Sequence, residues 1–316
     1  MRALLVASLQ EHAGRTGVVA ALAQRLAYEG RRVLALRLGA TADAAANADA
    51  QFFATLPGAR GRGSEPLLPA DGGSAVAQLA GDSIPIVEVP DSRDLVSLAV
   101  ALNAGVVIVW RGVPTAASVA LLQNLALELG VRFVGVVVTA VPQAALAAVG
   151  TVMDEAALPV LATLSEDRLL YSPTIGEIVD ALQADLLLGE EAEAQVIEEL
   201  MIGSITTDPG QPYYSRRGNK AVITRSDKTD MQLAALATDT DCLILTGGFS
   251  PSPYTLDRAS SEEVALMVTR GDTRATIERL ADVFGGSRFS SERKLERISD
   301  LLRERLDWST ITAALG

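Results

Sequence analysis

Short apolar runs alternate with helical patterns along the first half of the chain, and this alternation limits the possible folds more than any other property of the sequence. Between the runs, apolar residues recur at helical spacing over 18–28, 95–102 and 116–129. Strands buried on both faces of a parallel sheet are near-continuous apolar runs, and right-handed crossover helices join them. The runs rich in β-branched residues lie at 3–7, 33–36, 84–89, 106–110 and 134–138. The sequence therefore predicts an α/β fold with a doubly wound, mostly parallel sheet.

A second, smaller α/β unit is predicted to follow the first. A last short strand at 159–164 is followed by a polar passage, so we place the boundary after residue 165. Thr174 and Glu177 then have the spacing of a capping box, which predicts the start of a helix. Further strands are predicted near 201–205, 221–224, 243–245 and 264–268, and helices over 229–238 and 273–284. The expected domains are residues 1–165 and 166–316, the second including an amphipathic helix over 290–306.

Composition supports this fold class and excludes some partners. Apolar residues make up 49% of the 316 residues but aromatic residues only 4%, which is typical of sheets covered by close-packed helices. The formal net charge is −12, so no electrostatic attraction to nucleic acid or to an anionic membrane surface is expected. No apolar run reaches the roughly 18 residues that a membrane-spanning helix needs. We therefore expect a cytoplasmic protein without nucleic-acid or membrane partners.

The chain has one cysteine and one histidine, which excludes an intrachain disulfide and a metal cage of histidines and cysteines. Cys242 begins the apolar run CLIL, so a buried thiol in a strand is favoured over a nucleophile. His12 is expected to lie in a solvated loop.

A candidate phosphate-binding loop follows the first apolar run. It extends from Ser8 to Thr16 and leads directly into a helical pattern. In such loops, backbone N–H groups face the phosphates, a lysine reaches the terminal oxygens, and a threonine hydroxyl ligates Mg²⁺. Gly14 and Thr16 fit these roles, whereas Arg15 occupies the lysine position. The alternative is an ordinary strand-to-helix turn in which Gly14 provides the tight bend.

Residues 1–165 resemble the dethiobiotin synthetase-like P-loop domain. As in that family, five residues separate the first loop residue from the motif, which is Gly-Lys-Thr in the family and Gly14-Arg15-Thr16 here. A second family lysine follows the second strand, where Arg37 stands in this sequence. The resemblance implies that ATP or another nucleotide would contact Gly14, Arg15, Thr16 and Arg37. It also implies a Mg²⁺ site made of Thr16, Asp49 and Glu88.

Asp49 and Glu88 could also have roles other than binding Mg²⁺. Asp49 is equally well explained as a solvated helix residue. Glu88 could instead pair with Arg15 or Arg37. Such a pair would fill a nucleotide site with the protein's own charges, and we state it as a hypothesis.

Residues 172–285 resemble the DRTGG domain, which is named for an Asp-Arg pair and a later Thr-Gly-Gly. The corresponding residues here are Asp227, Lys228, Thr246, Gly247 and Gly248, with lysine in place of the arginine. Asp227 precedes a helical run, so capping of that helix is favoured over catalysis. The two glycines either form a tight turn or expose N–H groups to an anion. The resemblance implies that this set contacts a ligand or an interface, and that two copies of the chain pair.

Together the two units resemble the N-terminal regulatory region of long bacterial phosphate acetyltransferases. The acyl-transferring domain of those enzymes has no counterpart in this sequence, so acetyl transfer is not expected. The leading hypothesis is a non-catalytic, homodimeric regulatory protein that senses a nucleotide or a small phosphorylated metabolite. One alternative is an ATP-dependent carboxylate ligase of the dethiobiotin synthetase or cobyrinate amidating type. Another is a purely structural, dimeric interaction protein.

Overall fold

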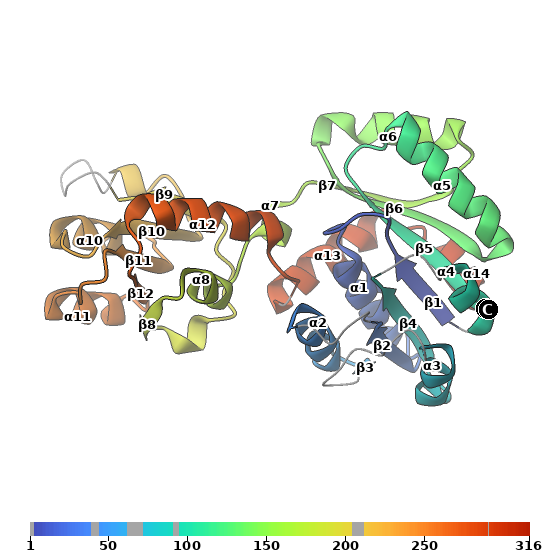
Figure 1. Cartoon of the computed structure of the whole chain (residues 1–316), viewed down its shortest axis with the longest axis horizontal. Coiled ribbons are helices and arrows are strands. Elements are labelled where there is room, and N and C mark those ends of the chain that lie inside the picture. The colour runs from blue at the N-terminus through green and yellow to red at the C-terminus, as the bar shows by residue number, and fades with distance from the viewer. Residues whose placement is uncertain (1–2, 39–43, 62–71, 91–94, 204–211, 290) are drawn as a thin grey trace. The chain divides into compact units, whose positions relative to one another are not determined.

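Two compact units make up the structure, which is a computed structural model. Met1–Asp167 and Lys294–Gly316 form the first unit, and Arg168–Arg293 form the second. Figure 1 shows a sheet with packed helices in each unit. The residues that the structure describes are 3–38, 44–61, 72–90, 95–203, 212–289 and 291–316.

The first unit contains a seven-stranded sheet in which all neighbouring strands are parallel. The strand order β3-β2-β4-β1-β5-β6-β7 places β1 in the middle, between β4 and β5. All residues of β1 are buried, as expected for a strand that is covered on both faces. The strands are β1 (Ala3–Ala7), β2 (Val33–Arg37), β3 (Arg60–Gly61), β4 (Ile84–Val89), β5 (Ala104–Arg111), β6 (Phe133–Val141) and β7 (Val160–Ser165). The predicted doubly wound parallel sheet is confirmed.

Helices cover both faces of this sheet. On one face, alternate strand residues such as Leu5, Val87 and Ile108 share a core with residues of the helices α3 to α6. Because side chains alternate along a strand, Leu4 and Val6 face the other side, and there α1 packs against β1, β2 and β4. The helices are α1 (Arg15–Tyr28), α2 (Ala44–Ala54), α3 (Gly72–Ala80), α4 (Leu95–Ala101), α5 (Ala116–Leu129), α6 (Leu146–Glu155) and α14 (Trp308–Leu315).

The C-terminal helices correct the expected domain division. Residues 294–316 belong to the first unit, whereas the sequence pattern placed them in the second, with residues 166–293. The apolar stripe of α13 (Glu292–Arg305) is buried, and it comprises Leu295, Ile298, Leu301 and Leu302. Trp308 of α14 donates a hydrogen bond to Glu29 Oε1 (2.7 Å), and the Arg25 guanidinium lies 4.2 Å above the centre of its indole ring. An amphipathic stripe predicts that a helix is covered, but it does not identify the surface that covers it.

The second unit contains a five-stranded sheet with the order β8-β12-β11-β10-β9, in which only the edge strand β8 is antiparallel to its neighbour. Residues of α10 and α11 share a core on one face of this sheet, and residues of α8 and α12 share a core on the other. The strands are β8 (Asp185–Leu188), β9 (Glu199–Ile202), β10 (Lys220–Arg225), β11 (Cys242–Thr246) and β12 (Ala265–Thr269). The helices are α7 (Arg168–Tyr171), α8 (Ile175–Leu182), α10 (Thr229–Leu236), α11 (Pro253–Ser261) and α12 (Thr273–Gly286).

Several local predictions are confirmed. Thr174 and Glu177 form the capping box of α8, since each side chain accepts a hydrogen bond from the backbone N–H of the other residue (3.2 and 2.9 Å). Cys242 is fully buried in β11, where desolvation raises the pKa of its thiol far above the usual range. His12 is exposed in the loop after β1. Within the described part of the chain, no helix is both long enough and apolar enough to cross a membrane.

Candidate functional site

The loop between β1 and α1 is held in place by the ends of β5 and β6. Gln10 exchanges two hydrogen bonds with the backbone of Arg111, at 3.2 and 2.7 Å. The Thr139 hydroxyl donates to the carbonyl oxygen of Ala13 (2.8 Å). Gly14 has a φ of 90°, a left-handed conformation that favours glycine, and α1 begins at the next residue. The loop is therefore an ordered strand-to-helix connection at the carboxyl edge of the sheet, where α/β folds bind ligands.

Sequence reasoning missed Gln10 and the anchoring role of Thr139. Neither residue type is characteristic of a phosphate loop, and their partners lie more than a hundred positions away in the sequence. Their position at the ends of apolar runs was the only available signal.

The arginines at the two lysine positions are both engaged by Glu88. Pairing of β2 with β4 places Arg37 directly opposite Glu88, so their side chains emerge together at the end of the sheet. Arg37 Nη1 lies 2.7 Å from Glu88 Oε1 and 2.5 Å from Asp49 Oδ2. Arg15 Nε lies 3.6 Å from the same Glu88 oxygen, and Arg15 Nη1 donates to the carbonyl oxygen of Pro90 (2.9 Å). The hypothesised pairing of Glu88 with these arginines is present in the structure.

These four residues form a neutral cluster, which we call the arginine–carboxylate network: Arg15, Arg37, Asp49 and Glu88. Two positive and two negative charges offset each other, and the Glu88 side chain is only 1% exposed. Burial lowers the pKa of the Arg15 guanidinium, and the charge of Glu88 opposes that shift.

The candidate Mg²⁺ ligands are brought together, but a guanidinium lies between them. Arg37 Nη1 bridges Glu88 and Asp49, and the Thr16 hydroxyl donates to Glu88 Oε1 (3.2 Å). Magnesium requires several oxygen ligands in near-octahedral geometry at about 2.1 Å. A cation could approach both carboxylates only if Arg37 moved away. The arrangement therefore does not fit Mg²⁺, and among the described residues no group of three or more histidine, cysteine, aspartate or glutamate side chains could hold a metal ion.

Two buried atoms of the network have unused hydrogen-bonding capacity. Within the described residues, Glu88 Oε2 and Arg37 Nε have no hydrogen-bond partner. A buried polar atom without a partner costs about 1–3 kcal/mol, so a small polar molecule would be stabilised there.

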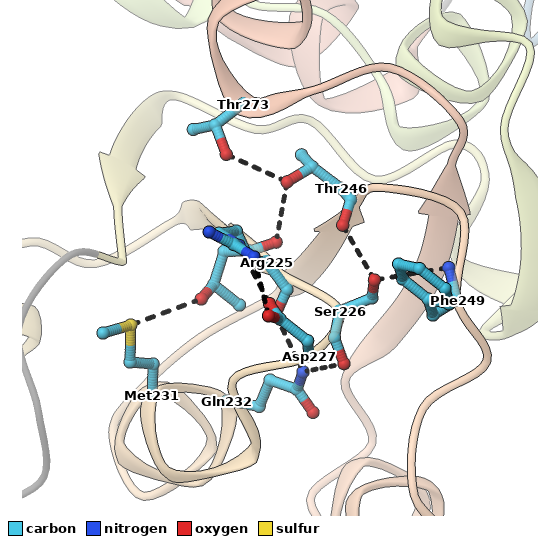
Figure 2. A network of polar contacts seen from close by, with 9 residues as sticks. Arg225, Ser226, Asp227, Met231, Gln232, Thr246, Phe249 and Thr273 are labelled. Atoms are coloured by element: carbon cyan, nitrogen blue, oxygen red, sulfur yellow. Dashed lines mark hydrogen bonds and ion pairs between the residues drawn. The ribbon is translucent and has the colours of Figure 1, made fainter.

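The second unit places its motif residues at the carboxyl edge of its sheet. Strands β10, β11 and β12 pair in register and end at Arg225, Thr246 and Thr269. The motif residues Asp227, Lys228, Gly247 and Gly248 follow directly after the first two of these strand ends. Figure 2 shows the polar contacts that join this region.

Asp227 does not cap α10, contrary to the sequence prediction. Its carboxylate instead accepts two hydrogen bonds from the guanidinium of Arg225, at 2.9 and 2.7 Å (Figure 2). The N-cap position is occupied by Lys228, whose side chain makes no capping bond. Because α10 begins at Thr229, Asp227 lies one residue before the N-cap, where its carboxylate pairs with Arg225 instead.

The Thr246-Gly247-Gly248 segment is a tight turn whose N–H groups are already bonded. Gly247 and Gly248 have φ values of 96° and 75° and donate to the carbonyl oxygens of Gly271 (2.9 Å) and Thr269 (3.0 Å). The Thr246 hydroxyl contacts that of Thr273 at 2.9 Å. The glycines therefore form a tight turn and do not expose N–H groups to an anion, because both N–H groups donate to backbone carbonyl oxygens.

Buried side chains that the sequence did not reveal as important support this turn. Ser226 donates to the Thr246 carbonyl oxygen (2.8 Å) and accepts from the Phe249 N–H (3.3 Å). Gln232 donates to the carbonyl oxygens of Arg225 and Ser226, each at 3.0 Å (Figure 2). Serine and glutamine are common on surfaces, so only their contacts mark them as part of the site.

Comparison with known proteins finds a match within the second unit. Residues 177–283 match the family model of the DRTGG domain. Among solved structures, the chain is similar to the CBS and DRTGG domains of the regulatory region of Clostridium perfringens pyrophosphatase, which was complexed with its activator diadenosine tetraphosphate. The identity is 17%, the match covers 45% of this chain and 70% of that chain, and the TM-score is 0.34.

Two further similar structures are cell-division proteins. One is the MinC:MinD complex of Aquifex aeolicus, with 15% identity, coverage of 54% of this chain and 84% of that chain, and a TM-score of 0.41. The other is the septum site-determining protein MinD of Pyrococcus horikoshii, complexed with Mg-ADP. Here the identity is 18%, the coverage is 54% of this chain and 83% of that chain, and the TM-score is 0.41.

Proposed function

We propose that this chain is a non-catalytic regulatory protein that senses a nucleotide or a small phosphorylated metabolite. Its organisation would correspond to the N-terminal regulatory region of long bacterial phosphate acetyltransferases. In this proposal the first unit keeps a P-loop architecture without phosphoryl transfer, and the DRTGG unit carries ligand or partner contacts. The homodimer that the resemblance implies is part of the proposal.

The arginine–carboxylate network is the observation that carries the non-catalytic assignment. Phosphoryl transfer depends on cations that are available to the phosphates and on oxygen ligands that hold Mg²⁺. Arg37 is held by Glu88 and Asp49 at 2.7 and 2.5 Å, so a phosphate would have to compete with two carboxylates for one guanidinium. The network supports a loop that has exchanged its catalytic charges for internal pairs.

The ATP-dependent carboxylate ligase is disfavoured by the same geometry. That reaction would need Thr16, Asp49 and Glu88 as ligands of Mg²⁺, but the guanidinium of Arg37 lies between the two carboxylates. A purely structural role of the first unit is the second candidate, because a neutral, closed network requires no ligand.

Binding and turnover should be measured on the same preparation. We would titrate the protein with ATP, ADP, GTP and a dinucleotide by calorimetry, and measure ADP production from ATP. The expected result is binding of at least one nucleotide without ADP production. Production of ADP that Thr16→Ala abolishes would overturn the non-catalytic assignment. If none of these compounds binds, the nucleotide-sensing role is wrong and the structural role takes its place.

A further inference from the structure

Exposed aromatic and cationic side chains gather at the carboxyl edge of the second sheet. We call Lys228, Phe249 and Arg270 the edge cluster. They follow the paired ends of β10, β11 and β12, respectively, within a few residues of Arg225, Thr246 and Thr269. The carboxyl edge of parallel strands is where open α/β sheets bind their ligands.

Phe249 is exposed yet held in position. Its residue is 67% exposed to solvent, and its N–H donates to the buried hydroxyl of Ser226 (3.3 Å). The turn before it is fixed by the N–H groups of Gly247 and Gly248. A Cβ atom added to Gly247 would lie 3.9 Å from Phe249 Cδ2, so the phenyl ring lies against the turn. An aromatic ring that is already ordered loses little conformational freedom when a planar group stacks on it.

The two cations of the edge cluster are available to a ligand. Among the described residues, neither Lys228 nor Arg270 takes part in an ion pair, and both are exposed. Arg225 differs, because Asp227 binds its guanidinium through two hydrogen bonds. The stem of Arg270 lies close to the turn, since a Cβ atom added to Gly248 would be 3.5 Å from its Cα and 3.7 Å from its Cγ.

Among the described residues, the carboxylates nearest to these cations in the sequence form no ion pair with them. Asp227 is engaged by Arg225, and Asp272 caps α12 by accepting a hydrogen bond from the Ala275 N–H (2.8 Å). Lys228 and Arg270 therefore remain exposed cations at the ends of β10 and β12, on the strands to either side of the one that Phe249 follows.

We propose that the edge cluster is the binding site of a nucleotide, and this inference rests on the sensing role proposed above. The phenyl ring of Phe249 stacks on the base, and Lys228 and Arg270 bind the phosphate oxygens. Stacking tolerates any base, and lysine and arginine are the usual partners of phosphate. This assigns the ligand to the second unit and leaves the arginine–carboxylate network of the first unit closed.

The test compares ATP with inorganic pyrophosphate, which has the charge but no base. Calorimetry on the full chain should show that Phe249→Ala weakens ATP binding about tenfold or more and leaves pyrophosphate binding unchanged. Arg270→Ala should weaken the binding of both compounds. Phe249→Trp should restore ATP affinity because it keeps an aromatic face. Tyr28→Ala serves as the matched control, since Tyr28 is an aromatic residue of the first unit with 73% exposure.

The outcomes separate this inference from the proposed function. If ATP binds and Phe249→Ala has the same affinity as Tyr28→Ala, the edge cluster is not the site, although the sensing role stands. Loss of ATP binding in Arg15→Ala but not in Arg270→Ala would place the ligand in the first unit and overturn the inference. If the wild-type protein binds neither ATP nor any other nucleotide, both the inference and the nucleotide-sensing role are wrong. The unfolding temperature of each variant shows whether the fold is retained.

Discussion

Glu88 connects the charges of the first unit through a single oxygen atom. Its Oε1 accepts hydrogen bonds from Thr16 and Arg37 and lies 3.6 Å from Arg15, while the residue is almost completely buried. A buried ion pair stabilises a protein only modestly, but removing one partner leaves an uncompensated charge. The network is therefore sensitive to the loss of this one carboxylate.

Glu88→Gln should reduce the free energy of unfolding by about 3 kcal/mol, because Arg37 would lose a charged partner in a buried position. Denaturant unfolding measures the change. Asp82→Asn is the matched control, since Asp82 pairs with Arg32 at 3.8 Å on the open surface and should contribute less than about 1 kcal/mol. Equal effects of the two substitutions would show that the network is not a structural element.

Lys220 provides a pH-dependent prediction. It is fully buried at the start of β10, where its ammonium donates to the Asp239 carbonyl oxygen. Desolvation lowers the pKa of this ammonium, and the charges of Asp239 and Asp241 oppose the shift. The folded protein therefore releases this proton at a lower pH than the unfolded chain does.

Between the lowered pKa and the ordinary value of about 10.5, the unfolded chain binds more protons than the folded protein does. The contribution of Lys220 to the free energy of unfolding therefore rises with pH in this range. Measured against Lys220→Met, the wild-type free energy of unfolding should increase as the pH is raised through this window. A difference that is constant with pH, or that falls, would contradict the pKa shift.

At the level of elements, sequence reasoning succeeded where a pattern is local. Apolar runs located most strands of both sheets, and the capping-box spacing located the start of α8. The strands β3 and β8 and the helix α11 were missed, because β3 has two residues, β8 is a short, partly exposed edge strand and α11 is predominantly polar. The strand predicted over 201–205 corresponds to β9 (Glu199–Ile202), which begins two residues earlier. Residues 204 and 205 lie outside the described residues.

The residues of the candidate site were likewise predicted in part and missed in part. Residue types and loop position indicated that Arg15, Arg37 and Glu88 could meet, and the register of β2 with β4 brings the latter two together. The pairing of Asp227 with Arg225 could not be inferred, because a capping role and an ion pair are equally compatible with that sequence. Phe249 was missed for a different reason, since an exposed aromatic residue has no periodic pattern.

Thr174→Ala should reduce the free energy of unfolding of the second unit by about 1 kcal/mol, because α8 would lose a side-chain cap. Thr151→Ala is a suitable control, since Thr151 lies inside α6 and is exposed, where alanine favours a helix. Denaturant unfolding of both variants gives the comparison. A loss as small as that of the control would show that the capping box contributes nothing.

At the scale of the whole molecule, the chain returns to the first unit after completing the second. Residues 294–316 pack with the first 167 residues, and the buried stripe of α13 includes Leu295, Ile298 and Leu302. Burial of each such side chain contributes on the order of 1.5–3 kcal/mol, so these residues contribute to the stability of the first unit.

Removal of residues 294–316 should lower the unfolding temperature of the first unit without changing that of the second. The two transitions can be separated by calorimetry, or by following Trp110, which lies in the first unit, through its fluorescence. The truncated protein also loses Trp308, so Trp308→Phe in the full chain controls for the change in signal. A shift confined to the second unit would contradict the assignment of these residues.

We infer that the arginine–carboxylate network has closed the phosphate loop to magnesium-dependent chemistry. The most direct test is calorimetric titration of the full chain with ATP, with and without Mg²⁺, while ADP is measured in the same samples. We expect that Mg²⁺ neither tightens ATP binding nor leads to ADP formation, because Arg37 lies between the two carboxylates that would hold the ion. Tighter binding or ADP formation that requires Mg²⁺ and disappears in Thr16→Ala would contradict it.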